Sequence, residues 1–492
     1  MTDARTPRTI TNFGGNHQFT PHALFTSRSE AELLEILRAN RGQRIRAIGR
    51  LHSWSPALVG EEVVIDTHLL NRVSVHDDGV APFADIEAGC QIKHALTELA
   101  RQGGFTLPTL GLITEQSIAG AAATGTHGSG RHCLSHYVQS VRLACYDPQT
   151  GEPVIRVIDG GAELRAAQCG LGCLGIITSV RLPIRKQYQI EEHLVRYNTL
   201  TEVLDQEAEY PLQQFFLVPW RWDYYAQHRR ETDRSRSMLA WLYRFYWSLG
   251  MDVAFHALIY LLIRGLPGFC TRQFYRWIMP CLIPQGWRVV DRSDRQLTME
   301  HELFRHIEIE LFVQRSQLPA AAEYVTWLLR HLGGERVAPT ESVRTALQQH
   351  GQWQQLESLH GTYLHHYPVC VRKVLADETL ISMSSGDAEP WYALSFISYA
   401  HPSRRDSFYR FADVLARTMA SLFNARPHWG KYCPLPPAEL RRLYPHLDQF
   451  AEMCRSTGSL AVFANDWLRG ILTPCETTKI NGSASDIGSP PL

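Results

Sequence analysis

The sequence predicts an α+β protein with more than one domain. The chain has 492 residues, which is more than one domain usually holds. Helix-like and strand-like patterns mix over the first 185 residues or so, and turn-rich segments join them. The stretch from about 190 to 425 is longer and less regular, and it carries amphipathic helix patterns.

The first elements follow from capping and alternation. Ser29 and Glu32 form an S-x-x-E capping box ahead of an apolar stripe, so a helix is expected that ends near Gly42. Polar and apolar residues alternate over 44–48, which predicts a strand, and 63–65 is a second short strand.

Further elements are predicted along the chain. Apolar residues recur with helical period over 92–99. Strands at 138–146 and 154–158 flank the turn sequence DPQTG, which is typical of a hairpin, and 176–182 alternates as another strand. Two later segments, 319–332 and 408–422, are expected to be helices.

Composition excludes some partners. Lysine plus arginine equals aspartate plus glutamate, 49 each, so no basic excess favours binding to nucleic acid. The eleven cysteines are scattered and odd in number, which favours reduced thiols. The N-terminus lacks the apolar run of a signal peptide. A cytoplasmic protein, with or without membrane association, is therefore expected.

Residues 238–264 are strongly apolar and leave three interpretations open. The clean run 253–263 contains His256 and is shorter than the roughly 20 residues that span a bilayer. Arg244 and Asp252 interrupt the longer run. A buried helix pair, a helix in the membrane interface and a transmembrane helix all remain open. The anchors of an interfacial helix would be Trp241, Tyr243, Tyr246 and Trp247.

Two glycine-rich segments differ in meaning. Residues 120–130, GAAATGTHGSG, are too small to build a core, and their amides suit an anion such as phosphate, although a flexible linker would have a similar composition. Residues 170–175 match G-x-G-x-x-G, but a strand-like segment follows where a dinucleotide fold needs a helix. A tight turn is expected there.

Histidines and one lysine are the remaining candidates. His52 lies in a polar turn after the strand in AIGRLHSWSP, where it could cap the turn, bind a metal, act as a base or hold a cofactor. His127, His132 and His136 lack a correctly spaced carboxylate, so no metal is expected. Lys431, in RPHWGK, either counters a developing negative charge or lies in a surface loop.

Taken together, the motifs resemble those of a known family. AIGRLHSWSP, ITEQSIAGAAATGTHGSG, LGCLGIITSVRL, ARPHWGKY and AVFANDWLRGIL occur in the order found in the vanillyl-alcohol-oxidase flavoproteins. Within that family the chain is similar to the aldonolactone and alditol oxidases, from about residue 10 to 473. The resemblance implies an N-terminal segment at 1–17, a PCMH-type FAD-binding domain of two subdomains at 18–188, an α+β cap or substrate domain at 189–425 with an apolar helical insert at 238–280, a C-terminal strip at 426–475 that returns to the flavin, and a disordered tail at 476–492.

The resemblance also implies the cofactor. His52 matches the histidine that covalent members bond to the flavin, although Arg50 and Leu51 stand where small residues are usual. Gly111 matches a position beside flavin carbon 4a, where a small residue favours dioxygen access and hence an oxidase. The implied FAD-binding residues are Ile48, Gly49, Arg50, Leu51, His52, Ser53, Gly111, Leu112, Ser117, Gly120, Thr124, Gly125, Thr126, His127, Gly128, Gly175, Ile177 and Lys431.

The implied reaction is hydride transfer from a hydroxyl-bearing carbon to FAD, with dioxygen as acceptor and peroxide as product. Lys431 and Arg372 are the implied catalytic residues, and Cys370 and Ser395 would face the substrate. Cys370 replaces the family glutamate and Leu112 a serine, so a carboxylate that grips polyol hydroxyls is expected to be missing.

These departures argue against a plain alditol, and an aldonolactone is the expected substrate. A more hydrophobic alcohol is an alternative. So are an NAD(P)H-dependent flavin reductase of the same fold and a non-catalytic, membrane-bound binding protein. A small-molecule substrate and dioxygen are the expected partners, with peripheral membrane contact through 238–264 and no bound metal.

Overall fold

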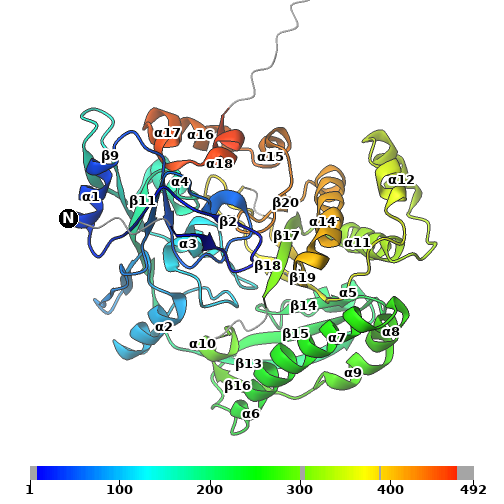
Figure 1. Cartoon of the computed structure of the whole chain (residues 1–492). Helices are drawn as coiled ribbons and strands as arrows, with labels where there is room; N and C mark the ends of the chain where they lie inside the picture. Colours follow the sequence, from blue (N-terminus) through cyan, green and yellow to red (C-terminus); the bar gives the residue numbers. More distant parts are fainter. Residues whose placement is uncertain (1–7, 300–304, 387–388, 400, 474–492) are drawn as a thin grey trace, which may run out of the picture.

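The computed structural model describes residues 8–299, 305–386, 389–399 and 401–473. The predicted tail at 476–492 lies outside these ranges. Figure 1 shows two main parts, with the N-terminal half in blue and cyan on one side and a large sheet on the other.

The N-terminal half contains a three-stranded and a five-stranded sheet, besides the two-stranded pairs β1-β2 (Ile10–Thr11 and Gln18–Phe19) and β12-β8 (Arg185–Lys186 and Phe105–Thr106). The order β3-β5-β4 is parallel, and β10-β9-β11-β7-β6 is antiparallel. The predicted helix begins at Ser29, whose side chain accepts the Glu32 amide, and the predicted hairpin is β9–β10. The bounds are β3 Ala23–Thr26, α1 Glu30–Ala39, β4 Ile45–Ile48, β5 Val63–Asp66, β6 Val73–His76, β7 Phe83–Glu87, α2 Ile92–Arg101, α3 Ile118–Ala123, β9 Ser140–Tyr146, β10 Pro153–Ile158, α4 Gly161–Gln168 and β11 Ile176–Pro183.

An eight-stranded antiparallel sheet forms the other part. Its order is β16-β13-β15-β14-β18-β19-β17-β20, so strands far apart in sequence become neighbours. The bounds are β13 Gln189–Tyr197, β14 Gln214–Val218, β15 Asp223–Thr232, β16 Val289–Arg292, β17 His306–Gln314, β18 Val369–Val374, β19 Trp391–Tyr399 and β20 Arg426–Pro427.

The two faces of this sheet differ because side chains alternate along each strand. On β17, Ile309 and Leu311 are buried in the apolar core, and the helices α11 (Leu318–Leu332) and α14 (Pro402–Phe423) pack against the strand. Glu308 and Glu310 alternate with these residues and line a cavity on the opposite face. The C-terminal helices then return to the N-terminal half, where α17 contacts β4 and α18 contacts the short turn Pro56–Leu58; the bounds are α15 Pro437–Leu443, α16 Leu447–Ser456, α17 Ser459–Phe463 and α18 Asp466–Leu472.

The apolar segment forms a helical insert on the outside of the sheet, drawn in green in Figure 1. One helix, Ala240–Gly265, is long and apolar enough to cross a membrane, and 12% of its most apolar window is buried. The interpretation of a buried helix pair is therefore wrong. The insert consists of α6 Ala240–Phe245, the π-helix η3 Tyr246–Phe255, α7 His256–Gly265, α8 Gly268–Gln273, the π-helix η4 Phe274–Ile278 and α9 Met279–Leu282.

Candidate active site

A cavity of about 720 Å³ lies between the N-terminal half and the eight-stranded sheet. Two bends of the N-terminal half line it, one around residues 48–53 and one around 116–127. The face of the sheet that carries Glu308, Glu310 and Arg372 forms another wall. Segments that are distant in sequence therefore enclose one space.

The two bends touch each other at a glycine. A Cβ atom built on Gly49 would lie 2.2 Å from Ser117 Oγ, so any larger residue would push the bends apart. The first bend is also held by the C-terminal strip, because the Trp54 amide donates to the Gly430 carbonyl at 2.8 Å. Backbone amides at close approach suit a diphosphate, and the residues present fit the dinucleotide FAD.

The residues after Gly49 are larger than the small residues usual at these positions, and the bend still forms. Leu51 has φ 58°, a left-handed conformation that favours glycine. Its side chain packs beside Ile48 and Leu58, and its carbonyl accepts the Phe13 amide at 2.9 Å. The neighbouring His52 ring stacks on Phe13 with centroids 4.7 Å apart and lines the cavity. The position agrees with a histidine that faces the cofactor.

All but two of the predicted FAD-binding residues line this cavity. The exceptions are corrections to the prediction. A Cβ on Gly125 would meet Met383, and a Cβ on Gly128 would lie 2.3 Å from the Leu110 carbonyl oxygen. These glycines belong to the second bend but pack against protein groups and do not line the cavity. The predicted residues on the cavity wall are Ile48, Gly49, Arg50, Leu51, His52, Ser53, Gly111, Leu112, Ser117, Gly120, Thr124, Thr126, His127, Gly175, Ile177, Cys370, Arg372, Ser395 and Lys431.

The expectation that the site lacks a carboxylate is wrong. Glu308 and Glu310 supply two carboxylates from β17, a strand to which the sequence analysis gave no role. Cys370, Ser395 and Glu310 lie opposite one another in register across β18, β19 and β17. A glutamate two strands away thus occupies the same row as the position where Cys370 replaces the family glutamate.

Glu308 is fully engaged by protein groups. Lys431 Nζ donates to Glu308 Oε2, and Ser395 Oγ donates to Glu308 Oε1 at 2.5 Å. Burial acts to raise the pKa of Glu308, but the Lys431 and His306 charges outweigh it and hold the pKa well below its usual range. Lys431 is therefore neither in a surface loop nor an isolated cation; it is half of a buried ion pair.

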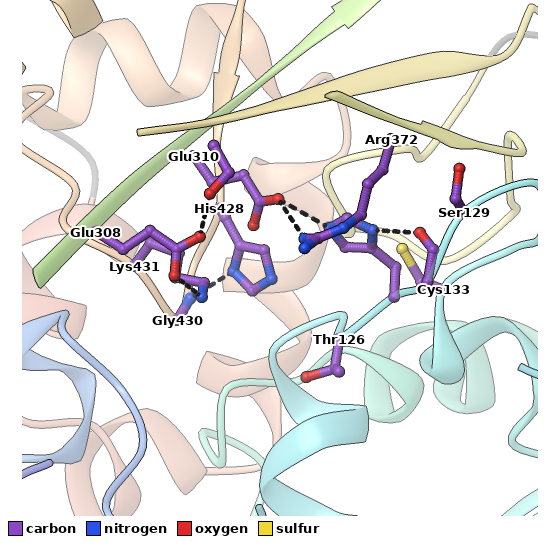
Figure 2. A network of polar contacts seen from close by, with 12 residues as sticks. Thr126, Ser129, Cys133, Glu308, Glu310, Arg372, His428, Gly430 and Lys431 are labelled. Carbon is purple, nitrogen blue, oxygen red and sulfur yellow. Dashed lines mark hydrogen bonds and ion pairs between the residues drawn. The ribbon is translucent and has the colours of Figure 1, made fainter. Parts of the chain in front are cut away.

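Glu310 is buried between two nitrogen-bearing side chains and lines the cavity. His127 Nε2 lies 3.4 Å and Arg372 Nη1 lies 3.6 Å from Glu310 Oε1, and among the described residues no group donates a hydrogen bond to this oxygen. Figure 2 shows Arg372 and Glu310 pointing toward one another. Burial acts to raise the pKa of Glu310, but the His127 charge outweighs it and lowers the pKa to about 2. The site thus holds an ionised carboxylate that can accept a ligand's O–H.

His428 completes the polar cluster as a neutral ring. The Gly430 amide donates to His428 Nδ1 at 2.9 Å, so the proton of the neutral ring is on Nε2. Burial lowers the pKa of His428 to about 3. Ligand atoms of His127, Glu310 and His428 lie within 4.8 Å of one another, close enough to hold a metal ion. However, His428 Nδ1 already accepts a hydrogen bond and its Nε2 carries the proton, so this ring offers no free lone pair to such an ion, and His127 Nδ1 faces the Gly128 carbonyl at 2.9 Å.

A buried polar chain runs from this cluster across the sheet. Arg372 Nε donates to Gln214 Oε1 at 3.1 Å, Gln214 donates to Gln227 at 2.7 Å, and Gln227 donates to Glu192 at 2.7 Å. The Tyr243 hydroxyl of α6 donates to the same Glu192 oxygen at 2.6 Å. This chain fixes the Arg372 guanidinium and connects the site to the helical insert.

Comparisons with known proteins agree with this arrangement. Residues 21–150 match the family model described as FAD binding domain, and residues 190–471 match the model described as D-arabinono-1,4-lactone oxidase. The chain is 50% identical to a long-chain alcohol oxidase from an uncultured marine euryarchaeote, over 94% of this chain and 96% of that one.

More distant similarities extend over a comparable length. The chain is 26% identical to the L-gulono-1,4-lactone dehydrogenase of Mycobacterium tuberculosis strain H37Rv, over 94% of this chain and 99% of that one. It is also 26% identical to an alditol oxidase of Streptomyces sp., with the same coverage. The crystal structure of cholesterol oxidase from B. sterolicum superposes with a TM-score of 0.72 at 15% identity, over 96% of this chain and all of that one, which shows the shared fold.

We predict that Gly49→Ala weakens FAD retention. The added methyl would collide with Ser117 Oγ and separate the two bends, so the dissociation constant for FAD should rise by about tenfold or more, an energy of roughly 1.4 kcal/mol. Fluorescence titration of FAD into deflavinated protein measures this, with both glycine variants made in a His52→Ala background so that no covalent bond forms. Gly470→Ala, at a glycine with no atom within 4 Å of a built Cβ, is the matched control. Equal affinities for the two variants would refute the cradle.

Buried His428 should make the fold acid-sensitive. Its folded-state pKa of about 3 lies below the ordinary 6.5, so the folded chain binds fewer protons, and the stabilisation is complete above pH 6.5 and is lost as the pH falls toward 3. Tm measured across this range should fall less steeply for His428→Gln than for the wild type. His94→Gln, at an exposed histidine, should keep the wild-type slope. An unchanged slope for His428→Gln would contradict the assignment.

Proposed function

The chain belongs to the family of FAD-dependent oxidases that carry the D-arabinono-1,4-lactone oxidase domain, and from this premise we propose that it oxidises a long-chain alcohol to the aldehyde. The members of this family act on CH–OH groups. The 50% identity to a long-chain alcohol oxidase supports the hydrophobic alternative over the aldonolactone that the sequence analysis expected. Dioxygen is the proposed acceptor, with hydrogen peroxide as the second product.

The observation that carries this proposal is an apolar strip on the cavity wall beside the carboxylate cluster. Glu308, Glu310 and Lys431 form this cluster. The wall continues through Phe216, which lies opposite Cys370 in register, and through Phe255 of the insert. A sugar lactone carries hydroxyl groups on most carbons and needs polar partners along its length. An alkyl chain with one terminal hydroxyl can lie along this apolar strip with its hydroxyl group at the carboxylates.

The chain's own residues would orient the reacting hydroxyl. Bound FAD supplies the hydride acceptor and passes the electrons to dioxygen. Glu310 lines the cavity, and its ionised carboxylate would accept a hydrogen bond from the substrate O–H and so orient the hydroxyl group; a carboxylate with a pKa of about 2 is a hydrogen-bond acceptor here and not the base that takes the proton. Arg372 and His127 keep this carboxylate ionised and fixed. The Lys431–Glu308 pair beside it positions positive charge at the same end of the cavity.

We also propose that FAD is bonded to His52. This residue lines the cavity on the first bend, and its ring is held by stacking on Phe13. A covalent bond would prevent FAD from dissociating unless that bond were broken. The resemblance noted above supports this role, and the geometry of the bend agrees with it.

A substrate screen tests the proposed function. In an oxygen electrode, purified holoenzyme should consume dioxygen with long-chain 1-alkanols and release peroxide. Because each buried methylene contributes about 0.8 kcal/mol, kcat/KM should rise by roughly fourfold per carbon until the chain fills the cavity. Aldonolactones and alditols serve as comparison substrates. Faster turnover of a lactone, or no dependence on chain length, would contradict the proposal.

Replacement of Glu310 should slow flavin reduction. Glu310→Gln keeps the shape but removes the negative charge, so reduction by the alcohol in anaerobic stopped-flow should fall by about tenfold or more. FAD content should stay at the wild-type level. Glu35→Gln, at an exposed position on α1, is the control and should behave as wild type. A Glu310→Gln rate within about threefold of wild type would exclude the role, since losing a hydrogen bond to a charged group should cost about 1.5 kcal/mol or more.

Acid precipitation tests the attachment to His52. Wild-type protein should retain its yellow colour in the precipitate, and His52→Ala should release FAD into the supernatant. His22→Ala, away from the cavity wall, should retain the colour. Equal release from wild type and His52→Ala would remove the covalent bond from the account and leave FAD binding intact.

A further inference from the structure

We propose that the helical insert docks on the surface of a lipid bilayer and that the alcohol enters the cavity from that side. The inference rests on the proposed function, since it supplies a sparingly soluble substrate. We define the insert face as the exposed large apolar side chains between 238 and 282. They are Met238, Leu239, Trp241, Leu242, Phe245, Leu249, Val253, Leu258, Leu261, Leu266, Phe269, Trp277, Ile278 and Leu282.

The insert face differs from the rest of the described molecule in the number of large apolar side chains that it exposes. Within the described ranges, the other large apolar side chains that are exposed are Val80 and Val157, which lie in the N-terminal half. Soluble monomers rarely expose so much contiguous apolar surface, and a patch of this kind marks a site of contact. Trp277 is 68% and Trp241 is 58% exposed, and such amphipathic rings favour the membrane–water interface.

The long helix is arranged to lie along a membrane and not across it. Tyr243, Phe255 and Ile259 are buried on its inner side, where Phe255 and Ile259 pack with Tyr225 of the sheet. The outer side is apolar and exposed. A helix that packs against the protein along its length, with the opposite side apolar, can insert only that side into a bilayer. Of the predicted anchors, Tyr243 therefore faces inward, and Trp241 keeps the predicted role.

The charge of the segment favours an anionic lipid surface. Residues 234–288 contain seven arginines and one aspartate, but Arg234, Arg236, Arg244 and Arg288 pair with Glu191 or Asp291 outside this segment, so the other arginines carry the argument. Arg264 and Arg276 are exposed within the insert. Basic side chains around an apolar face add electrostatic attraction to anionic headgroups. The same charge disfavours a second copy of the chain as occupant, because a symmetric dimer would bring two positively charged faces together.

The insert face also adjoins the substrate cavity. Trp247, Ser248 and Phe255 belong to η3 and line the cavity, and Ser248 is exposed. The helix that carries the apolar surface thus forms part of the cavity rim. An alkyl chain could pass from the bilayer to the apolar strip of the cavity wall with its hydroxyl group leading toward Glu310, without crossing bulk water.

Vesicle co-sedimentation of the full-length holoenzyme tests the docking surface. Wild type should pellet with vesicles of phosphatidylcholine mixed with phosphatidylglycerol and bind more weakly to phosphatidylcholine alone. The variant Trp241→Glu/Phe269→Glu/Trp277→Glu should bind at least about tenfold more weakly, because three exposed anchors become charged. Val80→Glu/Val157→Glu is the matched control and should bind as wild type.

Three outcomes would overturn the inference. Wild type could remain in the supernatant with anionic vesicles, the control variant could lose binding equally, or sedimentation analysis without lipid could show a stable dimer that the triple variant dissociates. The last result would assign the insert face to a second copy of the chain.

Turnover separates this inference from the proposed function. The triple variant should oxidise a short, water-soluble alcohol at the wild-type rate and lose activity by roughly tenfold on a long-chain alcohol presented in vesicles. Wild type that binds vesicles but oxidises no alcohol would refute the function and leave the docking surface. Wild type that oxidises alcohols but ignores vesicles would refute the docking surface alone.

Discussion

The contact of one buried carboxylate with a guanidinium and an imidazole ring organises the site. Glu310 belongs to β17, Arg372 to β18, and His127 to the second bend of the N-terminal half. A buried carboxylate is costly unless opposite charges compensate it, so the sheet and the N-terminal half must meet where these residues meet. The same constraint keeps Glu310 ionised on the cavity wall. Fold and chemistry therefore depend on the same contact.

The cavity has a direction because its two ends differ. At one end lie the ion pairs of Glu310 and of Lys431 with Glu308, which Figure 2 shows together. At the other end lies η3, whose inner side lines the cavity and whose outer side is exposed and apolar. A ligand with one hydroxyl group and a long apolar chain matches this order. The family also contains oxidases of sugar derivatives. The substrate class must therefore be inferred from the residues of the cavity wall and not from the fold.

Local patterns in the sequence were sufficient for part of this account. The helix begun by Ser29, the hairpin β9–β10 and the two bends that line the cavity were predictable, because each depends on neighbouring residues. Glu308 and Glu310 were missed. The alternation in HIEIELFVQ predicts a strand with both carboxylates on one face, but only the register with Cys370 and Ser395 shows that they enter the site. The exposure of the insert could not be predicted either, since apolar residues occur on both of its sides.

The central claim is that Glu310 receives the hydroxyl of a chain that extends toward the insert. A crystal structure of the holoenzyme, reduced anaerobically and soaked with a long-chain alcohol, tests this most directly. We expect the alcohol oxygen within hydrogen-bonding distance of the Glu310 carboxylate and the alkyl chain beside Phe216 and Phe255. An alcohol oxygen bound away from Glu310, or an alkyl chain that points away from η3, would contradict the account.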